Sequence, residues 1–311
     1  MTDLLVRREL HLTKSLLRAM DAAGGLWTIP STMDRWTLMR QRPLMLEEAR
    51  RRGVRALDAD RVDESLVGTL PDLEFLRDDG ISPGPLIARL TRLRSLSLAT
   101  WDGELDLRGL PRLEWLAIGE SKPGQLDSLT EGHPSLRDLT VGRYPAADLA
   151  PLGRLHLERL SLGDSRRLTS LANPGLLAET LVRLELWMLP ALGSLDGVEA
   201  LANLESLTLS SVRGVTTLDW VARLPKLRLL DVAELKNVES LAPLVGHPSL
   251  EWLECSRTRD MDLAPLRSLP RLRLYRAPRG SWRGDVAGLP DGSGLDWRDP
   301  EYAELLRFKN G

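Results

Sequence analysis

The chain has 311 residues, of which 42% are hydrophobic, and its formal net charge is only −2. This near-neutral balance argues against a protein that binds nucleic acid by neutralising phosphates. A single cysteine, Cys255, excludes an internal disulfide. No apolar run is long enough to predict a signal peptide or a membrane span, so we expect a cytoplasmic protein. Export without a cleaved signal would leave no mark on this pattern.

Residues 1–52 precede the regular part of the chain and predict a helical N-terminal cap. Apolar residues recur at helical spacing within residues 4–20, and this helix is expected to end at Gly24 and Gly25. A second helix is expected through residues 46–50. A cap here would cover the apolar end of the first coil of a repeat protein. A binding role of its own for this segment is left open.

One short phrase recurs throughout residues 53–280: an apolar residue, two others, an apolar residue, one other and an apolar residue. Its clearest copies read LRSLSL, LEWLAI, LRDLTV, LERLSL, LESLTL, LRLLDV and LEWLEC. Successive copies start 19 to 24 residues apart, and a period of this length is typical of a solenoid. Ten clear or weaker copies and a probable eleventh begin at Val54, Leu73, Leu93, Leu113, Leu136, Leu157, Leu181, Leu204, Leu227, Leu250 and Leu272.

Each copy of the phrase predicts a short β-strand. Side chains alternate between the two faces of a strand, so positions four and six of the phrase point one way and positions three and five the other. Positions four and six are almost all apolar, which predicts that they face the core. The segments between phrases carry apolar residues at a spacing of three, such as Leu195, Val198 and Leu201. That spacing predicts a short helix or 3₁₀ turn with one buried side.

Residues 281–311 carry several prolines and glycines and predict an irregular C-terminal cap. Trp282, Trp297 and the segment 302–306 are the side chains expected to close this end of the solenoid. A cap is needed here for the same reason as at the N-terminus.

The phrase resembles the LxxLxL core of leucine-rich repeats. The resemblance implies an α/β fold: a right-handed horseshoe solenoid with a parallel β-sheet on its concave face and short helical or 3₁₀ turns on its convex face. Leucine-rich repeats usually place Asn at position nine, whereas here that column includes Ile81, Leu189, Val212 and Leu235. We therefore expect packing to hold this turn. Return segments such as 148–152 resemble the short-repeat, internalin-like bacterial type.

The residues that could carry chemistry all have a structural interpretation. Cys255 stands at position six, so we expect an inert thiol in the core. His133 and His247 both occur in His-Pro-Ser-Leu, which favours a turn device repeated in two coils. They would lie roughly 24 Å apart at strand spacing, too far to share a metal ion. No catalytic, metal-binding or cofactor-binding motif is present, so we expect no enzyme, no cofactor and no metal.

The sheet face made by positions three, five, seven and eight is the candidate binding surface. Three tryptophans fall on or beside it, and aromatic anchors are enriched at protein interfaces. We expect these tryptophans to project outward around an acidic centre; the alternative is that they lie flat and cover the sheet. The predicted partner-binding residues are Trp115, Arg159, Arg183, Glu185, Trp187, Asp231, Trp252 and Glu254.

The function that this surface predicts is that of a non-catalytic scaffold for protein–protein interaction. The expected partner is a protein bound on the concave sheet face, without nucleic acid or membrane. The alternative is a regulatory or inhibitory subunit of an enzyme encoded elsewhere. The identity of the partner and the oligomeric state are not encoded in the pattern.

Overall fold

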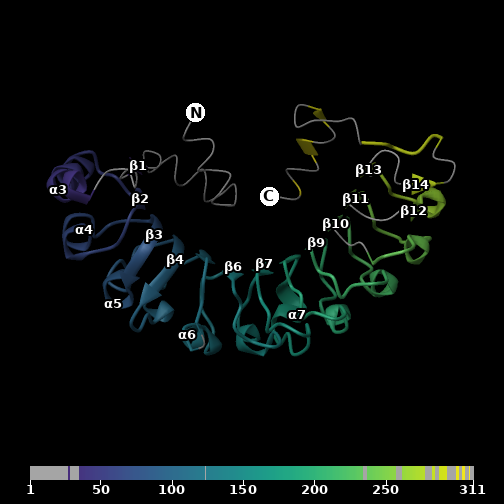
Figure 1. Cartoon of the computed structure of the whole chain (residues 1–311), viewed down its shortest axis with the longest axis horizontal. Helices are drawn as coiled ribbons and strands as arrows, with labels where there is room; N and C mark the ends of the chain where they lie inside the picture. Colours follow the sequence, from purple (N-terminus) through teal and green to yellow (C-terminus); the bar gives the residue numbers. More distant parts are fainter. Residues whose placement is uncertain are drawn as a thin grey trace. The chain divides into compact units, whose positions relative to one another are not determined.

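The computed structural model describes the greater part of the repeat region (Figure 1). Two compact units, residues 1–141 and 142–311, divide the chain, and each is described by itself. The expected helix in residues 4–20 lies outside the described residues, as do Leu235 and Trp297. The described residues are 27–28, 35–122, 124–233, 237–256, 261–276, 282–283, 287–292, 299–300, 303–304 and 308.

The first unit is a parallel sheet backed by short helices. Its strands pair in chain order and all in parallel. They are β1 (Trp27–Thr28), β2 (Ala56–Ala59), β3 (Phe75–Pro83), β4 (Ser95–Asp102), β5 (Trp115–Ile118) and β6 (Asp138–Gly142). The helical segments are α3 (Arg35–Arg51), α4 (Glu64–Thr69), α5 (Gly84–Ile87), the 3₁₀ turn η1 (Leu107–Gly109) and α6 (Asp127–Thr130). The helix expected through residues 46–50 is confirmed as the end of α3.

The second unit repeats this plan, with mostly 3₁₀ turns in its return segments. Its main sheet is also parallel and in chain order, and a separate pair of short strands lies beyond it. The strands are β7 (Arg159–Gly163), β8 (Arg183–Trp187), β9 (Ser206–Ser210), β10 (Leu229–Ala233), β11 (Trp252–Ser256) and β13 (Leu274–Arg276), with β12 (Met261–Asp262) paired to β14 (Trp282–Arg283). The return segments are η2 (Ala150–Leu152), α7 (Leu177–Thr180), η3 (Val198–Ala200), η4 (Asp219–Arg223), η5 (Ala242–Leu244) and η6 (Ala264–Ser268).

The leucine columns of the repeat stack in register. Leu184 pairs with Leu207, Leu207 with Leu230, and Leu230 with Leu253, so position four forms a continuous buried row through the second unit. The return segments bury a second row that includes Val198. In each unit the strands line one side and the short helices the other (Figure 1). The predicted alternation of the position-four and position-six columns is confirmed. Truncating one such buried leucine to alanine would lower the free energy of unfolding by roughly 2–5 kcal/mol.

Packing and a single hydroxyl group take the place of asparagine at the turns after β7, β8 and β9. Leu189 and Val212 are buried there, as expected. Ser165 accepts hydrogen bonds from the backbone N–H groups of residues 167 and 168, both at 3.1 Å, and donates to the carbonyl oxygen of Tyr144 at 2.6 Å. One serine therefore bridges two neighbouring coils.

The assignment of Ile81 to this turn position is wrong. Between Asp78 and Ile81 the pairing of β3 with β4 shifts by one residue, so Ser82 rather than Ile81 lies opposite Trp101. Ile81 is 66% exposed, whereas Ser82 is buried and accepts a hydrogen bond from the backbone N–H of Val62 at 2.6 Å. A single inserted residue thus exchanges the two faces of the strand end.

The structure describes no membrane-spanning element in the part of the chain it covers: none of those helices is both long and apolar enough to cross a bilayer.

Asp78 places a carboxyl group in the otherwise apolar column at position six. It lies opposite Leu98 and is completely buried. One carboxylate oxygen accepts from the backbone N–H of Gly80 at 2.9 Å, whereas Oδ2 has no hydrogen-bond partner within the described part of the chain. Burial raises the pKa of Asp78, against the lowering effect of its hydrogen bonds with Ser82 and Gly80. The charged form is therefore the unfavourable one in the folded state.

We expect Asp78→Asn to raise the melting temperature at pH 7. A carboxyl with a raised folded pKa supports folding below its unfolded pKa, about 3.9, and loses that contribution as the pH rises through the folded value. The gain should therefore shrink towards pH 3. Melting curves followed by circular dichroism at both pH values measure it. The exposed neighbour variant Asp79→Asn is the control, and an equal gain from both variants would contradict the interpretation.

Candidate functional site

The candidate site is the side of the second unit's sheet that faces away from the short helices, here called the strand face. Strand register places its side chains in two rows that cross the strands. The position-three row consists of Arg183, Ser206, Leu229, Trp252 and Leu274, and the position-five row of Glu185, Thr208, Asp231, Glu254 and Arg276.

The expectation that Trp252 projects outward is wrong. Trp252 is only 3% exposed and packs with Leu229 and Leu274 on the strand face, and Phe308 packs against this cluster. Asp231, expected in an exposed acidic centre, is buried as well. Part of the same chain, distant in sequence, packs against Trp252 on this portion of the strand face.

Trp115 also departs from the expected exposure. It lies in β5 of the first unit and is 2% exposed. Its Nε1 has no hydrogen-bond partner among the described residues. A buried indole with an unsatisfied N–H is unfavourable for the fold, because that group loses its bond to water.

Trp187 lies flat on the sheet, which is the alternative arrangement considered for the tryptophans. Gly163, its neighbour in β7, provides the space: a Cβ atom there would come within 1.9 Å of the Trp187 ring. The indole Nε1 donates to Ser161 Oγ at 3.3 Å. Trp187 therefore covers β7 instead of standing as an exposed anchor.

Much of the position-five row remains partly accessible. Glu185, Thr208, Glu254 and Arg276 are half-buried, and Arg276 Nη1 lies 3.3 Å from Glu254 Oε1. Arg159 and Arg183, also named as candidates, are half-buried on β7 and β8. Of the predicted residues in the second unit, the charged ones other than Asp231 thus keep a surface that another molecule could contact.

An aromatic side chain surrounded by arginines lies on the strand face. The ring centroids of Trp252 and Phe308 are 4.7 Å apart. The guanidinium carbon of Arg228 lies 4.5 Å from the centroid of Phe308, and that of Arg183 lies 5.5 Å from it. Arg273 approaches the ring of Trp252 at 5.4 Å. Sequence reasoning placed the segment 302–306 in a cap but missed Phe308, which stands outside the repeat and has no periodic signal.

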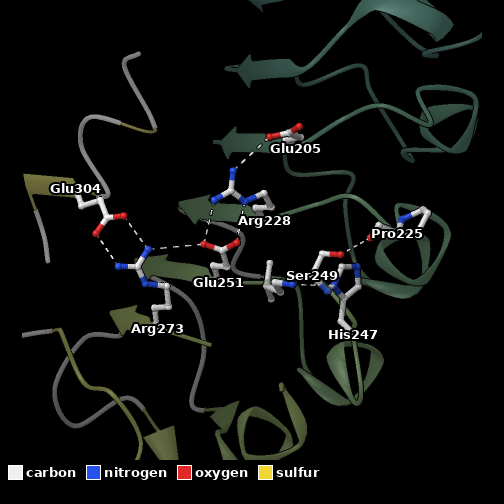
Figure 2. Close-up of polar contacts among 9 residues, drawn as sticks. Glu205, Pro225, Arg228, His247, Ser249, Glu251, Arg273 and Glu304 are labelled. Atoms are coloured by element: carbon white, nitrogen blue, oxygen red, sulfur yellow. Dashed lines mark hydrogen bonds and ion pairs between the residues drawn. The ribbon is translucent and has the colours of Figure 1, made fainter. Parts of the chain in front are cut away.

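A ladder of alternating charges runs beside this cluster, at position two of the phrases (Figure 2). Arg228 makes two hydrogen bonds to Glu251, at 2.8 and 3.1 Å, and lies 3.5 Å from Glu205 on its other side. Arg273 lies 3.9 Å from Glu251 and makes two bonds to Glu304, at 2.7 and 2.6 Å. The tail residue Glu304 therefore ends a ladder that successive repeats build.

The only thiol of the chain is part of the core. Cys255 is buried in β11, and burial, helped by the nearby charges of Asp231 and Glu254, raises its pKa to about 12. At neutral pH the group is a thiol and not the nucleophilic thiolate. The described residues contain no cluster of His, Cys, Asp and Glu that could hold a metal ion.

The two His-Pro-Ser-Leu segments connect neighbouring coils. His247 Nδ1 accepts from the backbone N–H of Leu250 at 3.2 Å, while Nε2 lies 3.1 Å from the carbonyl oxygen of Leu224. These partners assign the proton to Nε2. Ser249 Oγ donates to the carbonyl oxygen of Pro225 at 2.5 Å. His133 makes the same contacts in the first unit, so the predicted turn device is confirmed.

We expect His247 to make stability depend on pH. Burial lowers the pKa of His247, so its contribution is complete above the unfolded pKa of about 6.5 and is lost as the pH falls towards the folded value. The imidazolium would also lose Nδ1 as an acceptor. Leucine occupies this slot in other repeats, so His247→Leu should reduce the difference in melting temperature between pH 7.5 and 5.5. His156→Leu, at an exposed site, is the control; a wild-type difference in His247→Leu would refute the assignment.

We expect Gly163→Ala to destabilise the second unit by about 1–3 kcal/mol, because the new methyl group must displace the Trp187 ring. Urea unfolding measures the loss. Gly193→Ala is the matched control, since nothing lies within 4 Å of its Cβ position. The control should change the free energy of unfolding by less than about 0.5 kcal/mol. Equal effects would mean that Trp187 does not need this glycine.

No protein-family model and no curated protein matches the sequence. Among solved structures, the chain is similar to an internalin from Listeria monocytogenes, with 17% identity and a TM-score of 0.41 over 82% of this chain and 89% of that one. It is also similar to a leucine-rich-repeat protein of Leptospira interrogans, with 19% identity and a TM-score of 0.46 over 72% of this chain and 66% of that one. On its own repeat phrase, parallel register and short return segments, the chain is an α/β leucine-rich-repeat solenoid.

Proposed function

We propose that this protein is a non-catalytic interaction protein that binds a protein partner on the strand face of its second unit. The observation that carries the proposal is the half-buried, mixed-charge row of Glu185, Thr208, Glu254 and Arg276, aligned in register beside an aromatic cluster. Partly exposed charges around a packed aromatic centre are the usual composition of a protein interface.

The dimensions of the strand face favour a protein segment over a small ligand. Neighbouring strands lie about 4.8 Å apart, so the row from β8 to β13 extends on the order of 20 Å. The row follows the surface of a sheet, whereas small-molecule sites are concave and enclose most of the ligand. A peptide or the edge of a folded domain would contact several strands at once.

Two groups that could have carried a reaction, the Cys255 thiol and the His247 imidazole, are instead used by the fold. The Cys255 thiol is buried, and both nitrogens of His247 are engaged with backbone groups of the turn. The thiol and the imidazole therefore contact the interior of the repeats and not the strand face.

We expect Thr208→Arg to abolish capture of the partner, because it adds a long charged side chain in the middle of the position-five row. Ala222→Arg adds the same side chain to the exposed return turn η4 of the same repeat and is the matched control. Affinity capture from a lysate of cells that express this chain, followed by mass spectrometry, compares both variants with the wild type. Proteins retained by Ala222→Arg and lost with Thr208→Arg are the expected result. Identical sets from both variants would place binding elsewhere.

A further inference from the structure

We propose that Glu304 and Phe308 are a built-in occupant of the strand face, and that the external partner binds there by presenting the same two groups. The partner feature is a carboxylate followed four residues later by an aromatic side chain. This inference rests on the proposed function and names the chemistry of the partner segment.

The contacts of Phe308 are those of a bound side chain. Its ring packs against Trp252 with a centroid distance of 4.7 Å and contacts the apolar cluster that Trp252 forms with Leu229 and Leu274. Two guanidinium groups, from Arg228 and Arg183, lie 4.5 and 5.5 Å from its centroid. Cations attract the electron-rich face of an aromatic ring, so this place selects an aromatic side chain over an aliphatic one of similar size.

Glu304 supplies the second point of attachment. Each arginine of the charge ladder has a glutamate from a neighbouring repeat, but after Arg273 no further repeat phrase follows to supply one. Glu304 takes that place with two hydrogen bonds, at 2.7 and 2.6 Å (Figure 2). This two-bond geometry suits a carboxylate and fixes its direction.

The reach of the tail distinguishes an occupant from a simple end cap. A cap needs to cover only the last strand of the sheet, β13. Phe308 packs against a cluster formed by residues of β10, β11 and β13 and also approaches Arg183 of β8, which is well inside the surface that a partner would use.

The same contacts are suited to reversible release. The Glu304 side chain is 48% exposed in its ion pair with Arg273, and exposed ion pairs contribute little to stability. Phe308 keeps part of its surface accessible. The tail can therefore leave the strand face without disrupting the leucine core beneath it.

The spacing of the two groups defines the partner segment. The backbone N–H of Ala303 bonds to the carbonyl oxygen of Asp299 at 2.7 Å, which is one turn of helix, and Glu304 continues in helical conformation. Residues four apart lie on the same side of a helix. The matching ligand is a segment with glutamate four residues before phenylalanine.

Competition with the tail would reduce the affinity that a partner experiences. A segment tethered to its own site acts at an effective concentration in the millimolar range, which exceeds most partner concentrations. The apparent dissociation constant rises in proportion as the open fraction of the strand face falls. Removing Phe308 should therefore strengthen binding of a peptide added in solution.

The test uses the full chain and a fluorescein-labelled synthetic peptide with the sequence of residues 299–311 (DPEYAELLRFKNG). By fluorescence polarisation, the Phe308→Ala protein should bind the peptide at least about tenfold more tightly than the wild type, in line with release of a mostly occupied face. A peptide with alanine in place of its phenylalanine should not bind. Val245→Ala removes an exposed apolar side chain from the return side and should bind as the wild type does.

A second variant isolates the carboxylate contact. In the Phe308→Ala background, Arg273→Gln should weaken binding of the peptide. Replacing the peptide's second glutamate, the one equivalent to Glu304, by glutamine should then cost nothing further, because the two changes remove one interaction. Circular dichroism melting verifies that each protein is folded. If Phe308→Ala is unfolded, Glu304→Gln takes its place as the variant that loosens the tail.

Equal binding of the peptide to the wild type and to the folded tail variant would overturn the inference. That result leaves the proposed function standing if Thr208→Arg still loses partners that Ala222→Arg retains. Conversely, strong peptide binding together with identical capture by those two variants would support the tail contact and reject the strand face as the partner site.

Discussion

The structure depends on the in-register stacking of one apolar column after another. Because positions four and six of each phrase lie directly beside their equivalents in the next strand, leucine meets leucine along both units and the alternate row is directed to the other side of the sheet. A shift of one residue would reverse these faces. The shift in β3 demonstrates this locally, since it buries Ser82 and exposes Ile81.

The repeat made the fold predictable, because the phrase recurs every twenty-odd residues and each copy shows, by its apolar residues, which side of the strand is buried. The buried columns, the short return turns and the two histidine turn devices follow from that periodicity. Exceptions to the period were not predictable. Asp78 stands at position six of its phrase, but its burial could not be read from a charged residue in an apolar column. Ile81 follows an inserted residue, and this departure is visible only from the pairing of the strands.

The candidate site was predictable only in part. Alternation correctly placed Trp252 and Glu254 together on the strand face, with Leu253 pointing the other way into the core. It could not say what else lies on the strand face. Phe308, more than fifty residues away and outside any repeat, packs against the cluster that contains Trp252. For Trp187 the decisive neighbour was Gly163, whose missing side chain allows the ring to lie flat.

The charge ladder has a consequence for how this solenoid can change in length. Glu205, Arg228, Glu251, Arg273 and Glu304 alternate in sign, so every interior member is shared by two neighbours of opposite charge. Deleting or duplicating one coil within this series would bring like charges together. Gaining or losing two coils at a time would preserve the alternation of charge. This part of the solenoid can therefore change in length by pairs of repeats more easily than by single ones.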